Sequence, residues 1–423
     1  MKQYSVKRYC FTGFLCMMLC LSLEAQDSVH ITLQDAESRF VQNNLALLAE
    51  RYNINIAKAN LLQAKLFENP TISVSANLFD PKQKRFFNVS NSSGQYDIAV
   101  QQLVRLAGKR NKEIKLAETS ISLSEDKFAD LLRTLRYTLR STFFQLYYLQ
   151  QSVNSYNRQL DILRRMSVAY DDLARKSVVT QKDALRIKAL MYSLSAEQTS
   201  LVNQAAEQES ALQILLQSNR NYFIPLPVEE PTIAVSELSL GALVDTAYAN
   251  RPDMVMARHN LLFEQQNYRL QKALAKPDLT LGAEFDKRGS FVDNASFLTM
   301  AIDLPFFKRN QGNIRAAKFL TDQGRVLAEL QQQTVANEVQ AAYSKLINTD
   351  KMLGSVDPAF ESAFDKMLQG VTDNFQKKNI SLIEFTDFYE SYRNNILQFN
   401  QLRNDRRQAM ETLQFVVGKK IFN

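Results

Sequence analysis

The stretch Asn69-Pro70-Thr71-Ile72-Ser73-Val74-Ser75-Ala76-Asn77-Leu78 decides the fold class of this chain. Asn69-Pro70 ends the helical spacing of residues 33–67, because proline disfavours a helical conformation at the residue before it. From Thr71 on, polar and apolar residues alternate, which predicts a strand with one wet and one apolar face. The pattern returns at 279–285, and we expect partner strands at 96–104 and 296–304. Alternation at 96–104 is weak, so the register of that strand stays open.

The two strand regions belong to an internal duplication. Residues 31–78 align with residues 238–285 without a gap at an offset of 207, and further on the offset becomes 201. A period of about 200 residues is too long for a solenoid and indicates two similar halves. We expect a signal peptide at 1–26, a first repeat at 27–220, a linker at 221–237 and a second repeat at 238–423. The aligned identities include Asn43 with Asn250, Arg51 with Arg258, Asn60 with Asn267, Lys65 with Lys272 and Pro70 with Pro277.

Each repeat is expected to continue from its hairpin into two long helices. No glycine occurs from Lys109 to Phe223, and the residues are strong helix formers. A helix over 109–176 would be about 100 Å long at 1.5 Å per residue. Gly354 and Pro358 are expected to bend its counterpart in the second repeat. A coiled-coil seam with spacings of three and four is predicted at Leu163, Met166, Tyr170 and Leu173.

Capping residues predict where the second long helix of each pair begins. Thr180 can cap a helix with Asp183 at the third position, and Ser381 with Glu384 forms a capping box. The carboxylates also suit the positive end of the helix dipole. We therefore expect tight turns just before Thr180 and Ser381.

The N-terminus resembles an export signal, with basic residues at positions 2, 7 and 8 and an apolar stretch over 11–23. All three cysteines lie in the first 20 residues, and the chain has only two histidines, His30 and His259. This composition argues against an enzyme, a metal site or a cofactor. Met254-x-Met256-x-x-His259 resembles a soft-metal site, but core packing is the favoured interpretation. The net charge of +7, or +5 without the signal, and the lack of a dense basic run argue against nucleic-acid binding.

Four alternating strands of this length suit tilted β-structure across a bilayer, which takes roughly 9–11 residues per strand. Four strands cannot close a barrel, because single-chain membrane barrels start at about eight strands. Three chains would supply about twelve, enough for an open lumen. The alternative is a soluble periplasmic coiled-coil interaction protein, whose hairpins never enter a membrane.

Several motifs resemble the TolC family of outer-membrane efflux channels over essentially the whole mature sequence. They are residues 31–36 with Asn43-Asn44, the strand entry at 69–71, and Ala249-Asn250-Arg251-Pro252-Asp253. Two further stretches resemble the cobalt-zinc-cadmium resistance branch of that family. These are Gln102-Leu103-Val104-Arg105-Leu106-Ala107-Gly108-Lys109-Arg110 and Leu304-Pro305-Phe306-Phe307-Lys308-Arg309-Asn310-Gln311-Gly312-Asn313-Ile314, each at a crossover from strand to long helix.

The resemblance implies a mostly α-helical chain with a membrane β-barrel, in which a homotrimer forms a 12-stranded barrel in the outer membrane and an α-helical periplasmic tunnel. It implies a passive exit duct of a tripartite efflux system, with a periplasmic adaptor protein and an inner-membrane pump of the RND type as partners, and heavy-metal cations or drugs as substrates. Family turns usually carry glycine where this chain has Ser177 and Lys378. The implied docking and aperture residues are Val178, Val179, Thr180, Asp183, Asn379, Ile380, Ser381, Leu382 and Glu384, with Asp172 and Asp373 as a possible acidic aperture ring.

Overall fold

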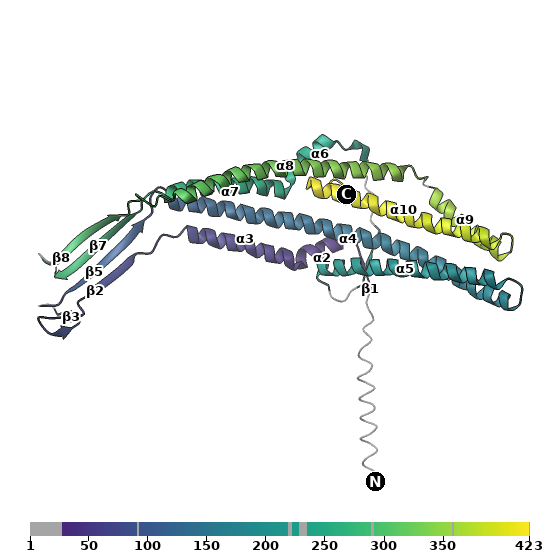
Figure 1. Ribbon diagram of the computed structural model, residues 1–423, viewed down its shortest axis with the longest axis horizontal. Helices are drawn as coiled ribbons and strands as arrows, with labels where there is room; N and C mark the ends of the chain where they lie inside the picture. Colours follow the sequence, from purple (N-terminus) through teal and green to yellow (C-terminus); the bar gives the residue numbers. More distant parts are fainter. Residues whose placement is uncertain are drawn as a thin grey trace, which may run out of the picture.

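The computed structural model describes residues 28–90, 93–218, 222–227, 235–288, 292–357 and 359–422 (Figure 1). The expected signal peptide lies outside the described residues, as does part of the expected linker. The first half of the chain contains β1 (Ser28–Ile31), α2 (Leu33–Asn43), α3 (Leu45–Ala64), β2 (Thr71–Ala76), β3 (Phe79–Asp80), β4 (Arg85–Phe86), β5 (Tyr96–Val104), α4 (Lys109–Arg175) and α5 (Gln181–Leu216).

The second half follows a similar but not identical order of elements. It contains β6 (Tyr222–Pro225), the short 3-10 helix η1 (Val235–Glu237), α6 (Leu240–Asn250), α7 (Pro252–Leu274), β7 (Leu279–Arg288), β8 (Asp293–Ile302), α8 (Gln311–Gly354), α9 (Phe360–Gln376) and α10 (Leu382–Val417). β6 pairs in parallel with β1 and so ties the chain between the halves to the start of the first half.

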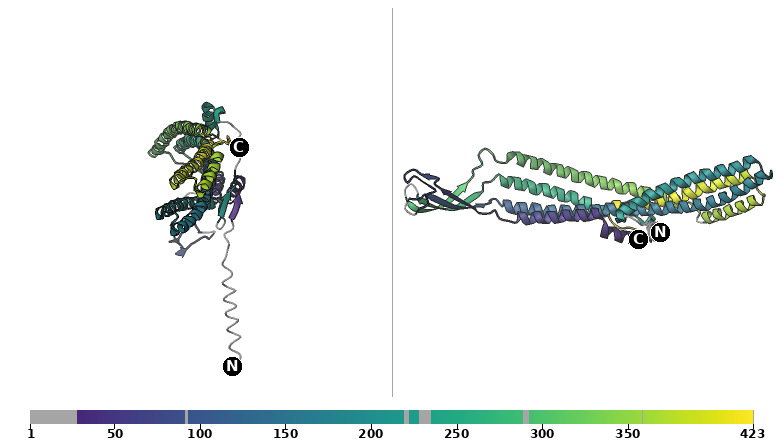
Figure 2. Two further views of the ribbon diagram at one scale, coloured as in Figure 1. Left: turned by 90° about the vertical axis from the view of Figure 1, so that its right-hand side faces the viewer. Right: turned by 90° about the horizontal axis from the view of Figure 1, so that it is seen from below.

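The molecule is a long curved rod with a sheet at one end and two helix turns at the other (Figures 1 and 2). α4 alone has 67 residues, which corresponds to about 100 Å of helix. The expected rod is therefore confirmed. None of the helices in the described ranges is both long enough and apolar enough to cross a membrane.

Two pairs of helices in the two halves correspond closely in length and position. α5 and α10 both have 36 residues and begin 201 positions apart, and α2 and α6 both have 11 residues. α5 and α10 also end alike, at Gln217 and Gly418 in the left-handed conformation. The duplication read from the sequence is thus also a duplication of local structure.

Two expectations about helix continuity were wrong. The helix expected over 33–67 is divided at Asn44, whose side chain accepts hydrogen bonds from the backbone N–H groups of Ala46 and Leu47 and so caps α3. The second half divides at the corresponding Arg251, where Pro252 starts α7. The second long helix is broken rather than bent, because α8 ends at Gly354 and α9 begins at Phe360. Pro358 lies outside the described residues.

Three hydrophobic clusters form the core of the rod. One belongs to the first half, one to the second, and the third joins α4, α5, α9 and α10 towards the turns. Leu163 and Met166 of the expected seam are buried in the third cluster, and Tyr170 stacks on Phe375 with ring centroids 5.4 Å apart. The third cluster therefore joins the two halves in the part of the rod near the turns.

The four-stranded sheet is antiparallel throughout, in the order β2-β5-β7-β8, which leaves β2 and β8 at its edges. The observed register settles the strand that the sequence left open. Ile72, Val100, Ala283 and Leu298 lie opposite one another across all four strands, and so do Thr71, Gln101, Gly282 and Thr299 one position away. One face of the sheet is therefore mainly apolar and the other mainly polar, with Leu103 and Phe297 as apolar exceptions on the polar face. Leu298 is 93% exposed in the single chain.

Candidate functional site

The two turns that join α4 to α5 and α9 to α10 share one backbone geometry. Ser177 and Lys378 adopt left-handed conformations, with φ of 59° and 63°. Val178 N–H then donates to the Leu173 carbonyl at 2.9 Å, and Asn379 N–H donates to the Asn374 carbonyl at 2.8 Å. This is a Schellman-type helix end, which normally uses glycine at the left-handed position. Serine and lysine there put backbone strain into both turns.

Each turn leads directly into a capped helix, as the sequence predicts. The Thr180 hydroxyl accepts from Asp183 N–H at 3.1 Å and donates to the Asp183 carboxylate at 2.7 Å. In the second turn, Ser381 N–H donates to Glu384 Oε2 at 2.7 Å and Glu384 N–H donates to Ser381 Oγ at 3.2 Å. Hydrogen bonds from the Ser381 backbone and side chain lower the pKa of Glu384. These hydrogen bonds therefore fix each turn to the helix that follows it, α5 or α10.

The structure brings the implied docking residues together in two groups at one end of the rod. Val178 is 52% exposed, and Thr180, Asn379, Ser381 and Glu384 are also exposed. The remaining members are half-buried, and Ile380 and Leu382 pack against the third hydrophobic cluster. The half-buried members, by number, are Val179, Asp183, Ile380 and Leu382.

The two acidic residues proposed for an aperture ring differ in their surroundings. The Asp172 carboxylate accepts a hydrogen bond from Arg175 one turn along α4. Asp373 is exposed on α9, and its backbone carbonyl accepts from Lys377 N–H at 3.0 Å. Asp172 is thus neutralised locally, whereas Asp373 has no ion-pair partner among the residues that the structure describes.

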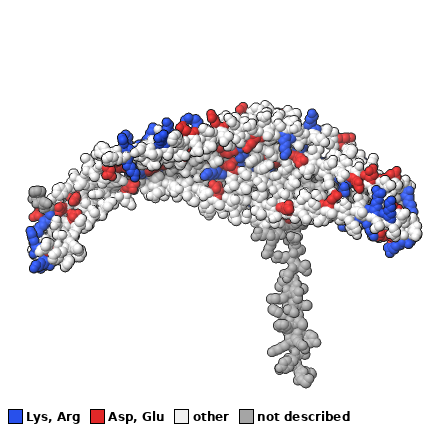
Figure 3. Space-filling view, in the orientation of Figure 1, with Lys and Arg blue, Asp and Glu red and all other residues white. Residues whose placement is uncertain are grey.

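Basic residues gather at the turn end of the rod, which sequence reasoning missed (Figure 3). Each lies within about two helical turns of Thr180 or Ser381, so adding up charge around the predicted caps would have revealed them. In the described part of the chain none of the five has an ion-pair partner. They are Lys176, Lys182, Arg186, Lys377 and Lys378, all exposed.

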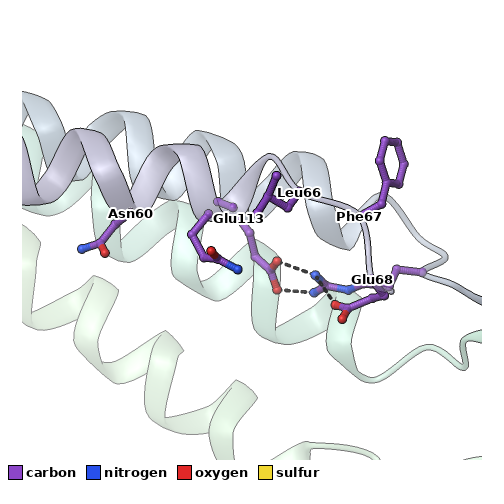
Figure 4. A pocket seen from close by; sticks show the side chains of 8 residues that line it. Asn60, Leu66, Phe67, Glu68 and Glu113 are labelled. Carbon is purple, nitrogen blue, oxygen red and sulfur yellow. Dashed lines mark hydrogen bonds and ion pairs between the residues drawn. The ribbon is translucent and has the colours of Figure 1, made fainter. Parts of the chain in front are cut away.

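Charged side chains lock the crossover between sheet and helices. Arg105, directly after the end of β5, forms an ion pair with Glu113 on α4 and lies 3.7 Å from a Glu68 carboxylate oxygen. These three residues line a cavity of about 400 Å³ beside the end of α3 (Figure 4). The buried Lys109 bridges to the second half, with Nζ 2.7 Å from Asp278. Much of the crossover motif therefore serves to hold the sheet on the rod.

Buried ion pairs lie at mid-rod, far from either end. Arg140 of α4 donates to Glu411 of α10 and to Glu37 of α2, and these carboxylates raise the pKa of Arg140 against the opposing effect of burial. Arg251 is 2% exposed and donates to Asp253, Glu338 and the carbonyl of Val416. Partners up to 271 positions apart along the chain cannot be paired from sequence spacing.

The soft-metal pattern does not form a metal site. Met254 is 7% exposed and belongs to the second hydrophobic cluster. His259 Nδ1 lies 2.6 Å from a carboxylate oxygen of Asp126 on α4. Across the described ranges no group of three or more metal-ligating side chains is present. The preferred interpretation of Met254 as a core residue is confirmed.

Comparisons with known proteins agree with this architecture. Residues 243–419 match the family of outer membrane efflux proteins. The chain is 23% identical over 409 residues to the cobalt-zinc-cadmium resistance protein CzcC of Cupriavidus metallidurans, covering 92% of this chain and 90% of that protein. Its fold matches the CmeC outer membrane channel of Campylobacter jejuni, with a TM-score of 0.73, 16% identity and coverage of 94% and 90%. It also matches CusC, with a TM-score of 0.74, 15% identity and coverage of 94% and 96%.

These matches and the sheet-capped rod show that the chain has the fold of outer-membrane channels. Residues 243–419 are the part that matches the outer membrane efflux protein family, and most of the chain is similar to the cobalt-zinc-cadmium resistance protein CzcC.

Proposed function

We propose that three copies of this chain form the exit duct of a tripartite efflux system, with a 12-stranded barrel in the outer membrane and a helical tunnel in the periplasm. The observation that carries the proposal is the open four-stranded sheet at one end of the rod. Its edge strands, β2 and β8, each lack a partner on their outer side among the described residues. Unpaired edges of this kind need to be covered or paired.

The number and direction of the strands suit closure by copies of the same chain. Neighbours alternate in direction across the four strands, so β2 and β8 run in opposite directions. β8 of one copy can therefore pair with β2 of the next as one more antiparallel pair. Three copies supply twelve strands, a number within the range of membrane barrels that enclose a lumen.

The two faces of the sheet suit a lipid exterior and an aqueous interior. The apolar row of Ile72, Val100, Ala283 and Leu298 would meet lipid. The opposite face carries polar residues such as Ser73 and Glu284. Alternation of this kind is typical of membrane barrels. In water it would be unfavourable, because the apolar face of the sheet would be exposed.

The turns at the other end are proposed to dock a periplasmic adaptor and to border the aperture. Exposed apolar side chains beside the rigid turns support this role, namely Val178 and Ile383 at 52% and 64% exposure. Of the two acidic candidates, Asp373 supports an aperture ring better than Asp172, because Arg175 already pairs with Asp172. An RND-type inner-membrane pump would load the duct through the adaptor.

We propose heavy-metal cations as the substrates, supported by the similarity to a cobalt-zinc-cadmium resistance protein. Small organic compounds are the alternative. A strain lacking this chain should lose tolerance to cobalt, zinc and cadmium and regain it with the wild-type gene. Unchanged metal tolerance with lost tolerance to organic compounds would overturn the metal assignment and leave the duct standing.

Docking can be tested separately, because residues 28–423 contain no cysteine. A Val178→Cys variant should form a specific cross-link with the adaptor through a bifunctional reagent. The matched control is Val326→Cys on α8, 63% exposed and distant from the turns in sequence, which should not. Equal cross-linking at both positions would contradict docking at the turns.

A further inference from the structure

A cavity of about 300 Å³ lies at mid-rod, where the two halves of the chain meet. Its walls come from α2, α4, the start of α7 and the C-terminal end of α10 with the residues that follow. It lies outside both the sheet and the turns, so the proposed efflux function assigns it no role. Five of its lining residues are cationic (Arg133, Arg136, Arg140, Lys419 and Lys420), against two carboxylates (Glu37 and Glu411).

Two of the five cations are already neutralised. Arg133 pairs with Asp130 at 2.7 Å, and its guanidinium also donates to the carbonyl of Phe415 at 2.8 Å. Arg140 pairs with Glu411 and Glu37. The side chains of these two arginines are only 13% and 12% exposed.

The other three cations have no ion-pair or hydrogen-bond partner in the part of the chain that the structure describes. Arg136 stands three and four residues from Arg133 and Arg140, on the same face of α4. Lys419 and Lys420 add two more cations at the same cavity. An anion bound among Arg136, Lys419 and Lys420 would supply the counter-charge that these three cations lack.

The two lysines sit on a fixed segment of backbone rather than on a free tail. Gly418 adopts φ of 71°, and a Cβ there would lie 3.0 Å from Cγ of Arg251. Beyond the lysines, the N–H groups of Ile421 and Phe422 donate to Gln414 Oε1 at 3.0 and 3.1 Å, and the Phe422 side chain is 1% exposed. Anchoring on both sides fixes the backbone from which the two lysine side chains extend, so no ordering of this segment is needed when a ligand binds.

One wall of the cavity is apolar and aromatic. The rings of Tyr137 and Phe415 stack with centroids 4.6 Å apart, and the Arg133 guanidinium lies 4.2 Å from the centroid of the Phe415 ring. Leu132 and Pro252 also line the cavity. A few placed charges beside a flat apolar wall are typical of small-molecule sites.

We propose that this cavity binds a small organic anion with at least two negative charges and a flat apolar body, such as an aromatic dicarboxylate. Arg136, Lys419 and Lys420 hold the charges, and Tyr137 and Phe415 contact the body. The volume suits one ligand of this size. This proposal does not depend on the identity of the exported substrate or on the adaptor.

The probe is 4-fluorophthalate, added to the purified full-length protein in a non-ionic detergent and followed by fluorine NMR. Wild type should bind it saturably with a dissociation constant below about 1 mM at low salt. Raising the salt to about 0.5 M should weaken binding severalfold, because exposed charges are screened. Absence of saturable binding to wild type would overturn the proposal.

The variants Arg136→Gln and Arg136→Gln/Lys419→Gln/Lys420→Gln should weaken binding progressively, the triple variant by at least about tenfold. The matched control is Lys318→Gln/Lys345→Gln/Lys351→Gln, which removes three exposed cations from α8. It should bind as wild type does. Equal weakening in the control would show that net charge rather than the cavity attracts the probe, and would refute the site. Thermal unfolding and the mass of the assembly verify that each variant folds and assembles.

Discussion

Replacing Val74 with arginine tests which face of the sheet meets lipid. Val74 lies near the middle of β2, is 66% exposed, and pairs with Ile98 on the apolar face. Arginine on the lipid face near the midplane of a membrane barrel costs about 2–4 kcal/mol per site. A value of about 3 kcal/mol corresponds to roughly 150-fold in the assembly equilibrium for each protomer.

The matched control is Ser73→Arg, one position away on the polar face. Ser73 is also exposed and pairs with Ala99 of β5. Its arginine would project into water, so the change in stability should stay within about 0.5 kcal/mol. Both variants place the same residue on the same strand, which separates the face of the sheet from any effect of arginine on strand formation.

The assay is the amount of detergent-extracted trimer recovered from outer membranes, measured on native gels at matched expression. Val74→Arg should yield little trimer, and Ser73→Arg should yield wild-type amounts. Equal yields would refute the assignment of faces. Loss of trimer with Ser73→Arg alone would show that the apolar face points inward.

Three further predictions concern the rod and its turns. Arg251→Met should lower the free energy of unfolding by about 1–3 kcal/mol, because it removes an ion-pair partner of the half-buried Asp253 and the buried donor to the Val416 carbonyl. A loss below about 0.5 kcal/mol in guanidinium titrations followed by circular dichroism would contradict this. Ser177→Gly and Lys378→Gly should each stabilise their turn by about 0.5–1 kcal/mol, because glycine accepts the left-handed conformation without strain, and slower amide hydrogen exchange at Val178 and Asn379 would show it. The cap at Ser381 should weaken as the pH falls below about 4, because the Glu384 carboxylate has a lowered pKa and loses its stabilising contribution as it is protonated. Amide hydrogen exchange around Ser381 should therefore become faster at low pH. Glu384→Gln should abolish this pH dependence, and an unchanged dependence would assign it to another group.

The sequence predicted those parts of the fold that are set by short-range spacing. Alternation located β2 and β7, the absence of breakers located α4 and α5, and the caps at Thr180 and Ser381 located both turns. Each of these signals acts within a few residues, so one segment contains all the information required.

The breaks in the helices were missed although the sequence held a signal for them. Pro252 is expected at the start of a helix, and the duplication places Arg251 opposite Asn44. Reading the two repeats together would have located both breaks. The register of β5 required its neighbours, because Val100 is identified as apolar-facing by its alignment with Ile72 and Ala283 rather than by its own alternation.

The charged residues at mid-rod and at the turns were beyond prediction from spacing for different reasons. Arg140 and Glu411 meet across 271 positions, and only the packing of α4 on α10 brings them together. The cations at the turns have no distinctive pattern in the sequence. They form one basic surface only because the fold places both turns at the same end of the rod. Long-range electrostatics therefore had to come from the structure.

The central claim is that three copies of this chain close one barrel in the outer membrane. Its most direct test is the protein molar mass of the species extracted by detergent from purified outer membranes, with bound detergent subtracted. The account predicts three times the protomer mass, found in that fraction alone. A monomer or dimer recovered from the periplasm without detergent would contradict it and favour a coiled-coil protein that never inserts.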